Sequence, residues 1–450
     1  PTAALDEDHP SVVWVRWTAP PGAVGQVTFG VDGAADRATP PVTGPDQQHR
    51  LLGLKAGHEV AWSALVDGQL AGSGVIAVPP APPQLPTLVV DAGDGSSLRG
   101  RYVLVAGADE AAQAGEEADL AFLGIFDADG DWVWWHLLPP GLATNGADPS
   151  ADGNLVYLAQ DDARQDPDSD LVEITLDGEV VGGARAVTGH HAMTELDGDS
   201  YAYLGRAFLP QPDGSTIVGD EIDRVHDGDD GSGAETVFGY VDDWWGGLDG
   251  YWGSCPPLEE ALGGYTQVCD LTHSNSLEYL PETGLLYAMA RLADTMLAID
   301  PDSGALVWQL GGRWSDFALP DGTSPSAGSA LWSGPHFSHV WRDGMVAFDN
   351  GVNRDPPVSS VVELSWDEAT GTVTEVFRYV DPDHGYTPAL GDVRKLLDGH
   401  YVATWMTLDK VTELDPAGAL VWEAEVVGSA NLRRIRVLDD LYDLTRSSER

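Results

Sequence analysis

The feature that most constrains the fold is a pair of strand patterns that repeats after residue 83. In the first pattern a turn glycine precedes a short apolar run, and this occurs six times, at Gly100, Gly153, Gly198, Gly284, Gly344 and Gly399. In the second, an Asp-rich turn precedes a branched or Trp-bearing strand, as in 299–308 and 414–422. The glycines recur about every 45 to 60 residues, apart from the interval that holds 206–270, which is typical of four-stranded propeller blades. The sequence therefore predicts an all-β fold, with a six-bladed β-propeller over 83–450 and an insertion at about 206–270.

Residues 1–82 follow a different pattern. The runs 12–17, 25–31 and 59–66 alternate apolar and polar residues, which is typical of half-buried strands. The proline-rich run 79–83 predicts a stiff linker. We therefore expect a small N-terminal β-sandwich over 1–82, similar to fibronectin type III domains, ahead of the propeller.

The net charge of −49 narrows the range of partners. Such an acidic chain repels nucleic-acid phosphates and anionic lipid, so both are excluded as expected partners. The sequence has no apolar stretch long enough to cross a bilayer, and we expect no direct membrane insertion. Small molecules are the expected ligands, and the sequence gives no indication of the oligomeric state.

The chain has two cysteines, Cys255 and Cys269, in a segment rich in Gly, Tyr and Trp. In an exported protein a disulfide between them would close a loop and stabilise it by roughly 3 kcal/mol. Residues 1–5 lack the features of an export signal, which agrees with a chain that begins after a removed signal or after a lipid-anchor segment. We expect an exported protein, periplasmic or extracellular.

Histidines recur at one position of the repeat. His191, His273 and His336 lie 7, 11 and 8 residues before the turn glycines of their blades. Because the loops that enter the first strands of all blades converge at one end of a propeller axis, these side chains are expected to meet in one funnel. His190 is the neighbouring candidate in the first of these segments, and His191 fits the repeat better.

At these residues the sequence resembles the bacterial arylsulfate sulfotransferases. The resemblance rests on His273 and Asn275, followed by Arg291 18 residues after the histidine, on His336 13 residues before Asp349, and on His191 at the entry to an earlier blade than His273. The pattern extends over about 90–440. The resemblance implies a six-bladed propeller enzyme that transfers sulfuryl groups from an aryl sulfate donor to a phenolic acceptor without a nucleotide. Such an enzyme would require no cofactor.

The resemblance also implies a role for each residue. His336 would be the nucleophile of a ping-pong reaction through a sulfohistidine, and His191 would assist the phenol oxygen. His273, Asn275 and Arg291 would hold the sulfuryl oxygens. The chemistry is consistent, because a sulfuryl group in transfer carries negative charge that guanidinium and imidazole groups stabilise.

Two features depart from the family pattern. Pro335 precedes His336 where the family usually has Gln. The segment 206–270 has no obvious counterpart, and its Trp245 and Trp252 are candidate contacts for a phenol ring, because aromatic faces stack on aromatic ligands. The same tryptophans would also serve to pack a long loop.

Two other functions remain open at this point. In one, His191, His273 and His336, with His384 as a fourth ligand, bind a transition metal for oxidative or hydrolytic chemistry. In the other, the propeller is a non-catalytic binding module. Separately, alternating carboxylates in an Asp-Gly turn are candidate ligands of a structural calcium ion at Asp127, Asp129 and Asp131.

Overall fold

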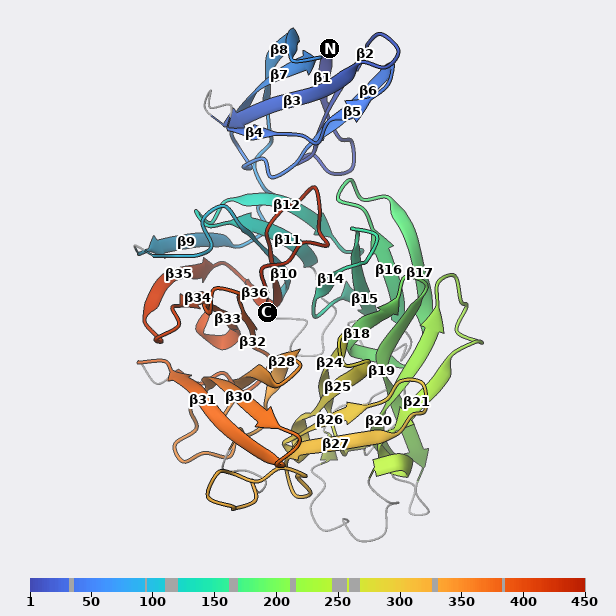
Figure 1. The fold of residues 1–450 in the computed structure, drawn as a ribbon, viewed down its shortest axis with the longest axis vertical. Helices are drawn as coiled ribbons and strands as arrows, with labels where there is room; N and C mark the ends of the chain where they lie inside the picture. Colours follow the sequence, from blue (N-terminus) through green and yellow to red (C-terminus); the bar gives the residue numbers. More distant parts are fainter. Residues whose placement is uncertain are drawn as a thin grey trace.

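The computed structural model describes residues 1–31, 36–93, 95–109, 120–161, 169–210, 216–244, 257–258, 268–325, 331–382 and 385–449. These residues form an almost entirely β structure (Figure 1). The short helices are η1 (Tyr240–Trp244), η2 (Arg291–Ala293) and η3 (Met406–Leu408). No helix in the described ranges is long and apolar enough to cross a membrane. The all-β prediction is confirmed.

The first eight strands form two sheets at the N-terminal end of the molecule (Figure 1). One sheet contains β1 (Thr2–Leu5), β2 (Val13–Thr18) and β6 (Asp46–Leu51), and the other contains β3 (Val24–Val31), β4 (Arg37–Ala38), β5 (Val42–Thr43), β7 (Glu59–Val66) and β8 (Gln69–Ala77). Buried and more exposed residues alternate along β3 and β7, because one face of that sheet packs on the core. Val13 and Val15 of the first sheet share this core with Val27 and Phe29 of the second.

Six further sheets surround a common centre (Figure 1). The first three contain β10 (Tyr102–Asp109), β11 (Ala121–Asp127), β12 (Trp132–Leu137) and β36 (Ala430–Leu438); β13 (Leu142–Ala143), β14 (Ala147–Pro149), β15 (Leu155–Asp161), β16 (Ser169–Ile174) and β17 (Val180–Ala186); and β18 (Gly189–Asp197), β19 (Ser200–Pro210), β20 (Thr216–His226), β21 (Glu235–Gly239), β22 (Pro257–Leu258) and β23 (Val268–Asp270).

The remaining three sheets complete the ring. They contain β24 (Ser274–Leu280), β25 (Leu285–Ala290), β26 (Thr295–Ile299) and β27 (Leu306–Gly311); β28 (His336–Trp341), β29 (Gly344–Asp349), β30 (Ser360–Asp367) and β31 (Thr372–Val380); and β32 (Asp392–Lys395), β33 (Tyr401–Trp405), β34 (Lys410–Leu414), β35 (Leu420–Val427) and β9 (Thr87–Ala92).

The innermost strands close the ring. β18 contacts β24, β24 contacts β28, β28 contacts β32, β32 contacts β36, β36 contacts β14, and β15 contacts β18. Both ends of the propeller chain take part in the closure. The C-terminal β36 pairs with β10 of the first sheet, and β9, which directly follows the linker, pairs with β35 of the last sheet. The fold is therefore a β-propeller, as predicted.

The strands after the turn glycines are not the innermost ones, and here the structure corrects the sequence analysis. β10, β15, β19, β25, β29 and β33 are each the second strand of their sheet, counted from the channel. In five of the sheets the innermost strand precedes the turn glycine, whereas in the first sheet it is the C-terminal β36. The second strands read as apolar runs because they are buried on both faces, as the fully buried β29 shows. The innermost strands face the channel and carry the polar residues. The histidines therefore lie at the beginnings of innermost strands.

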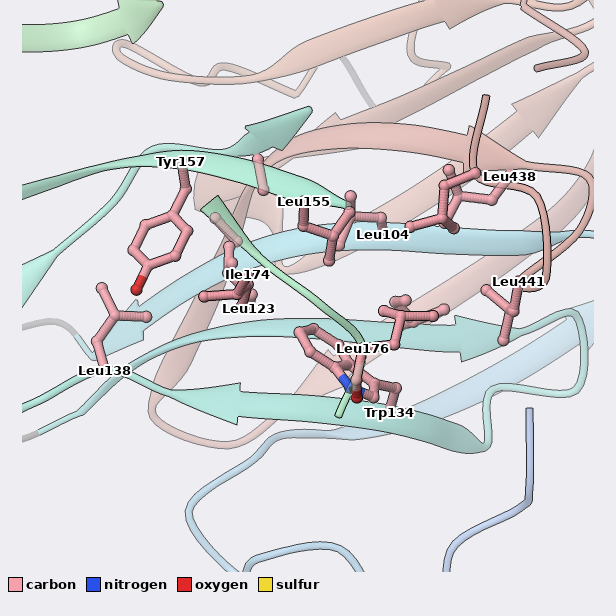
Figure 2. Close-up of a cluster of buried hydrophobic side chains, with 14 of the residues drawn as sticks. Leu104, Leu123, Trp134, Leu138, Leu155, Tyr157, Ile174, Leu176, Leu438 and Leu441 are labelled. Atoms are coloured by element: carbon pink, nitrogen blue, oxygen red, sulfur yellow. Dashed lines mark hydrogen bonds between the residues drawn. The ribbon is translucent and has the colours of Figure 1, made fainter. Parts of the chain in front are cut away.

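Apolar side chains fill the space between neighbouring sheets. Figure 2 shows one such cluster, in which Leu104 and Leu123 of the first sheet join Leu155 and Ile174 of the second. Burial of each of these side chains stabilises the fold by about 1.5–3 kcal/mol. Such packing fixes the sheets around the axis and holds their inner strand ends in place.

The stretch expected to be an insertion contributes partly to the third sheet. β20 and β21 pair there in register, and β23 pairs in parallel with β20. The aromatic contacts Trp245 and Trp252 and the cysteine Cys255 lie outside the described residues, as does His384. The side chain of Cys269 is also outside the description, so the proposed disulfide stays a prediction.

The candidate calcium ligands have a different partner. Asp127, Asp129 and Asp131 place carboxylate oxygens within 4.8 Å of one another. Lys55, which follows β6, points its ammonium group into this cluster, with Nζ 3.1, 2.6 and 2.8 Å from the three carboxylates. A resident calcium ion does not fit beside this cation, because two positive charges would share one set of oxygens. The triad instead joins the N-terminal sheets to the propeller.

Candidate functional site

The predicted site residues lie where three neighbouring innermost strands begin. His191 lies in β18, His273 directly precedes β24, and His336 is the first residue of β28. Ser276 Oγ of β24 lies 3.0 Å from Ser338 Oγ of β28. Each serine is the third residue of its strand, so the two strands begin at the same height along the channel. The three histidines therefore come from one end of the propeller channel.

The backbone turns sharply at each of these positions. His191 and His273 have φ values of 54° and 47°, and Gly334, two residues before His336, has φ 60°. A β-bulge follows each turn, because the pairing register shifts between His190 and Met193, between Ser274 and Ser276, and between His336 and Ser338. Positive φ values are uncommon outside glycine, and bulges re-aim side chains, so this combination is typical of a functional site.

His191 and His273 are in direct contact. Their ring centroids are 5.1 Å apart in an edge-to-face arrangement. Burial, together with the charges of His190 and His273, holds the pKa of His191 well below 6.5. His273 is less buried, and its Nδ1 bonds Oδ2 of Asp270. His191 is therefore a neutral imidazole beside a histidine that has a carboxylate partner.

Asn275 joins the second of these segments to the third. Its side chain is fully buried, and Nδ2 donates to the carbonyl oxygen of Pro335 at 3.0 Å. The amide oxygen of Asn275 is buried without a hydrogen-bond partner among the described residues. Such an unpaired buried acceptor is costly, and a bound ligand with a donor group would relieve that cost.

His336 is buried with 2% of its surface exposed. Its Nδ1 lies 2.7 Å from Oδ1 of Asn350. Burial and the nearby guanidinium of Arg291 hold its pKa well below 6.5, against the effect of the Asn350 hydrogen bond, and the charge of His273 adds to the depression. His336 is thus a neutral imidazole within electrostatic reach of both Arg291 and His273.

Arg291 follows β25 and begins η2. One terminal nitrogen donates to the carbonyl oxygen of Pro388 at 3.0 Å, whereas Nε is buried without a partner among the described residues. Burial lowers the pKa of Arg291, while the carboxylate of Asp270 opposes that effect. A partly buried guanidinium whose buried Nε has no partner among the described residues is suited to an anionic ligand.

Behind His191 lie His190, which the sequence analysis ranked below His191, and Asp220, which it missed. His190 Nε2 lies 3.2 Å from Oδ1 of Asp220, and both side chains are buried. Oδ2 of Asp220 accepts from the backbone N–H of Ser274 at 2.6 Å and from the hydroxyl of Thr272. The paired histidines were visible in the sequence, but Asp220 lies 30 residues after His190 in a different strand, and no local pattern marks it.

His339 occupies a different environment. It lies further along β28, where its Nδ1 accepts from the backbone N–H of Lys395 at 3.2 Å and its ring packs on Trp341. Of these two histidines, His336 is the one that lies within electrostatic reach of Arg291, and this favours His336 as the site residue.

The geometry of the histidines bears on the metal alternative. In the part of the chain that the structure describes, the carboxylate triad at Asp127 is the one group of three or more ligand residues with donor atoms within 4.8 Å of one another. His191, His273 and His336 are more widely spaced than that, and Arg291 adds a positive charge beside them. A site with this spacing and charge is suited to an anion rather than to a metal ion.

Fold and site together define a class: a β-propeller in which three neighbouring innermost strands begin with imidazoles and a guanidinium lies within electrostatic reach of them. The chain belongs to the arylsulfotransferase (ASST) family, whose model matches residues 102–416. This family transfers sulfuryl groups from aryl sulfates, so a sulfotransferase activity of this general kind is supported.

Solved structures give only distant similarity. The chain is 12% identical to a catalytically inactive virginiamycin B lyase from Staphylococcus aureus, over 76% of this chain and 88% of that one, with a TM-score of 0.34. It is 10% identical to apo AztD from Citrobacter koseri, over 92% and 98% of the two chains, with a TM-score of 0.32. No curated protein matches the sequence significantly. At these scores the structural neighbours carry no functional argument.

Proposed function

We propose that the protein transfers a sulfuryl group from an aryl sulfate to a phenolic acceptor in two steps, through a sulfohistidine at His336. The observation that carries the proposal is the 2.7 Å contact between His336 Nδ1 and Asn350 Oδ1 in a site that also holds Arg291. A neutral imidazole whose Nδ1 donates to an amide oxygen keeps its lone pair on Nε2, which is the form that attacks sulfur.

In the first step, Nε2 of His336 forms a bond to sulfur while the bond from sulfur to the aryl oxygen breaks. The aryl oxygen leaves with the bonding electron pair, and where the phenol is a weak acid His191 gives it the proton that was taken from the acceptor of the previous turnover. In the second step the acceptor oxygen attacks the same sulfur, its proton passes to His191, and the bond from Nε2 to sulfur breaks. The imidazole of His336 is then restored.

Three residues would hold the sulfuryl oxygens. Arg291 offers its unused Nε–H, and Asn275 offers the second hydrogen of its amide nitrogen. His273, with the carboxylate of Asp270 against Nδ1, can carry a proton on each ring nitrogen and donate from Nε2. Donors placed where charge develops lower the barrier, and removal of one such donor typically costs a factor of about 100 to 1,000 in rate.

Intact mass after donor treatment tests the proposal directly. The protein is incubated with 4-nitrophenyl sulfate in the absence of acceptor, and a mass increase of one sulfuryl group is expected, together with release of nitrophenolate. His336→Gln should show neither. His339→Gln is the matched control, because it changes another buried histidine of β28 outside the site, and it should be sulfated like the wild type. An unmodified wild-type protein, or a sulfated His336→Gln, overturns the assignment.

The proposed setting is outside the cytoplasm, in the periplasm or the extracellular space. The proposal rests on the cysteine pair, because a disulfide between Cys255 and Cys269 persists only in an oxidising compartment. Mass analysis of thiol-alkylated protein tests this, since alkylation of both cysteines in protein isolated from its host would contradict it.

A further inference from the structure

A hydrogen-bonded row of three groups, His191 and the buried His190 and Asp220, extends from the site into the third sheet. His191 Nδ1 lies 2.7 Å from His190 Nδ1, and His190 Nε2 lies 3.2 Å from Oδ1 of Asp220. The other oxygen of Asp220 is held by Ser274 and Thr272. The outer end of this row is His191, which contacts His273.

The partners determine where the protons lie. His190 Nε2 faces only acceptors, the Asp220 carboxylate and the carbonyl oxygen of Gly205 at 3.3 Å, so this nitrogen carries a hydrogen. In a neutral His190, Nδ1 is then an acceptor. Nδ1 of His191 must therefore carry the hydrogen that the two nitrogens share, which leaves the lone pair of His191 on Nε2. An uncharged row thus sets His191 as a base, which is the state that the sulfated enzyme needs to accept the proton of the phenol.

We propose that His190 and Asp220 form a proton relay behind His191, so that the proton of the phenolic acceptor passes to buried His190 and returns to the phenoxide that the next donor releases. This inference rests on the proposed function and adds two positioning residues to it. Neither residue contacts the sulfuryl group, and both act through His191.

The relay consists of two coupled proton transfers. The acceptor O–H bond breaks as Nε2–H forms on His191, while Nδ1–H of His191 breaks and Nδ1–H forms on His190. His191 is then neutral with its hydrogen on Nε2, and the positive charge lies on His190 against Asp220. When the next donor releases a phenoxide, the two transfers reverse and the phenoxide leaves as a phenol.

The charges around the row explain why the proton is displaced toward Asp220. His191 is faced by His190, His273, Arg206 and His336, and each of these disfavours an additional positive charge there. Burial and the charges of Arg206 and His273 lower the pKa of His190, but the Asp220 carboxylate in direct contact with it opposes that effect, and within the described ranges His191 has no such partner. A carboxylate that touches the second imidazole stabilises the charged state one residue away from the sulfuryl site.

A comparison of half-reactions tests the relay. Release of 4-nitrophenolate needs little protonation, so His190→Gln and Asp220→Asn should form the sulfated enzyme from 4-nitrophenyl sulfate within about threefold of the wild-type rate. Transfer to unsubstituted phenol should fall by about 100-fold, and the deficit should shrink with more acidic phenols. His400→Gln is the control, because it removes a partly buried histidine that bonds Glu413 at 2.8 Å outside the site. It should leave both half-reactions unchanged.

Equal losses in both half-reactions, or no loss in the acceptor step, overturn the relay. If the variants do not fold, nitrogen NMR of the wild type with labelled histidine decides the question, because His191 must carry its hydrogen on Nδ1 at neutral pH. The opposite tautomer overturns the relay. A wild-type enzyme that forms no sulfated intermediate contradicts the proposed function instead. The tautomer measurement does not depend on that intermediate, so it tests the relay separately.

Discussion

The Nδ1 atom of His336 donates a hydrogen bond to Oδ1 of Asn350 at 2.7 Å. The direction is certain, because the amide nitrogen of Asn350 donates to the carbonyl oxygens of Thr387 at 2.7 Å and Leu390 at 3.0 Å, which leaves its oxygen toward the ring. One asparagine therefore selects the tautomer of His336 and ties it to the loop that enters the sixth sheet.

Replacement of Asn350 by alanine should lower the transfer rate by at least about 100-fold, because the wrong tautomer of His336 becomes available. It should also lower the free energy of unfolding by about 1–3 kcal/mol for each carbonyl left unpaired. Kinetics with 4-nitrophenyl sulfate and chemical denaturation measure the two effects. Exposed Asn353, three residues later, provides the control variant Asn353→Ala. Wild-type rates in Asn350→Ala would exclude a role for this contact in catalysis.

Arg291→Met should reduce kcat/KM for the aryl sulfate by about 100- to 1,000-fold, because a charged donor to the sulfuryl oxygens is lost. It should also move the acidic limb of the pH profile upward. Arg291 depresses the pKa of His336, so its removal lets that pKa rise toward 6.5, and the nucleophile then becomes protonated at a higher pH. The titrating group, the His336 imidazole, also lies near His273 and is hydrogen-bonded to Asn350.

Arg291→Lys separates the two effects of that change. It keeps the positive charge, so the acidic limb should stay near the wild-type position, while the loss of the guanidinium geometry still raises KM. An acidic limb that is identical in wild type, Arg291→Lys and Arg291→Met would mean that another group controls it.

The sequence allowed us to identify candidate site residues where an ionisable side chain stands at a repeated position of the strand pattern. His191, His273, His336 and Arg291 recur at the ends of repeated strand patterns, and one repeat period brings such ends together on the axis. Asp220 and Asn350 could not be assigned in this way. Asp220 reaches His190 from β20 across the sheet, and Asn350 follows β29, so their contacts depend on side-chain geometry and not on spacing.

The order of strands within each sheet could not be read from hydrophobicity. The second strand is both buried and apolar, so it gives the strongest signal, while the channel-facing strand carries polar residues even where it is equally buried. Ring closure was hidden for a similar reason. β9 is a single alternating strand next to the linker, and nothing in residues 87–92 indicates that it pairs with β35.

A histidine pair at the N-terminal interface should make stability depend on acid. His9 Nε2 lies 3.1 Å from His136 Nδ1. The carboxylates that face His9 are those of Asp6, Asp8 and Asp177. The rings of Trp134 and Tyr157 contact His136. Burial lowers the pKa of both histidines, to about 4 for His136. The unfolded chain therefore binds more protons below pH 6.5, and stability present above that pH is lost as the pH falls toward about 4.

Thermal unfolding of His136→Gln measures that contribution. The variant is expected to unfold at a lower temperature than the wild type near neutral pH, and its midpoint should fall less steeply on acidification. His226, which is exposed, supplies the control variant His226→Gln, with an unchanged pH dependence. Parallel pH curves for wild type and His136→Gln would contradict the assignment.

The last prediction concerns Lys55, whose ammonium group occupies the carboxylate triad of Asp127, Asp129 and Asp131. Lys55→Gln removes the cation and leaves three carboxylates within 4.8 Å of one another, so stability should fall by about 1–3 kcal/mol. Clustered carboxylate oxygens are ligands that calcium prefers. Calcium should therefore raise the unfolding temperature of Lys55→Gln and leave that of the wild type unchanged.

Lys410→Gln is the matched control for this experiment. Lys410 pairs with Asp381 and with Glu423 at 3.6 Å, so its loss breaks an ion pair at a site that is not a triad of clustered carboxylates. It should be destabilised without a calcium response. A calcium-dependent rise in the wild type would show that the ion displaces Lys55, and the triad would then be a cation site after all. A calcium-insensitive Lys55→Gln would mean that the carboxylates separate when the ammonium group is removed, because their mutual repulsion is no longer balanced.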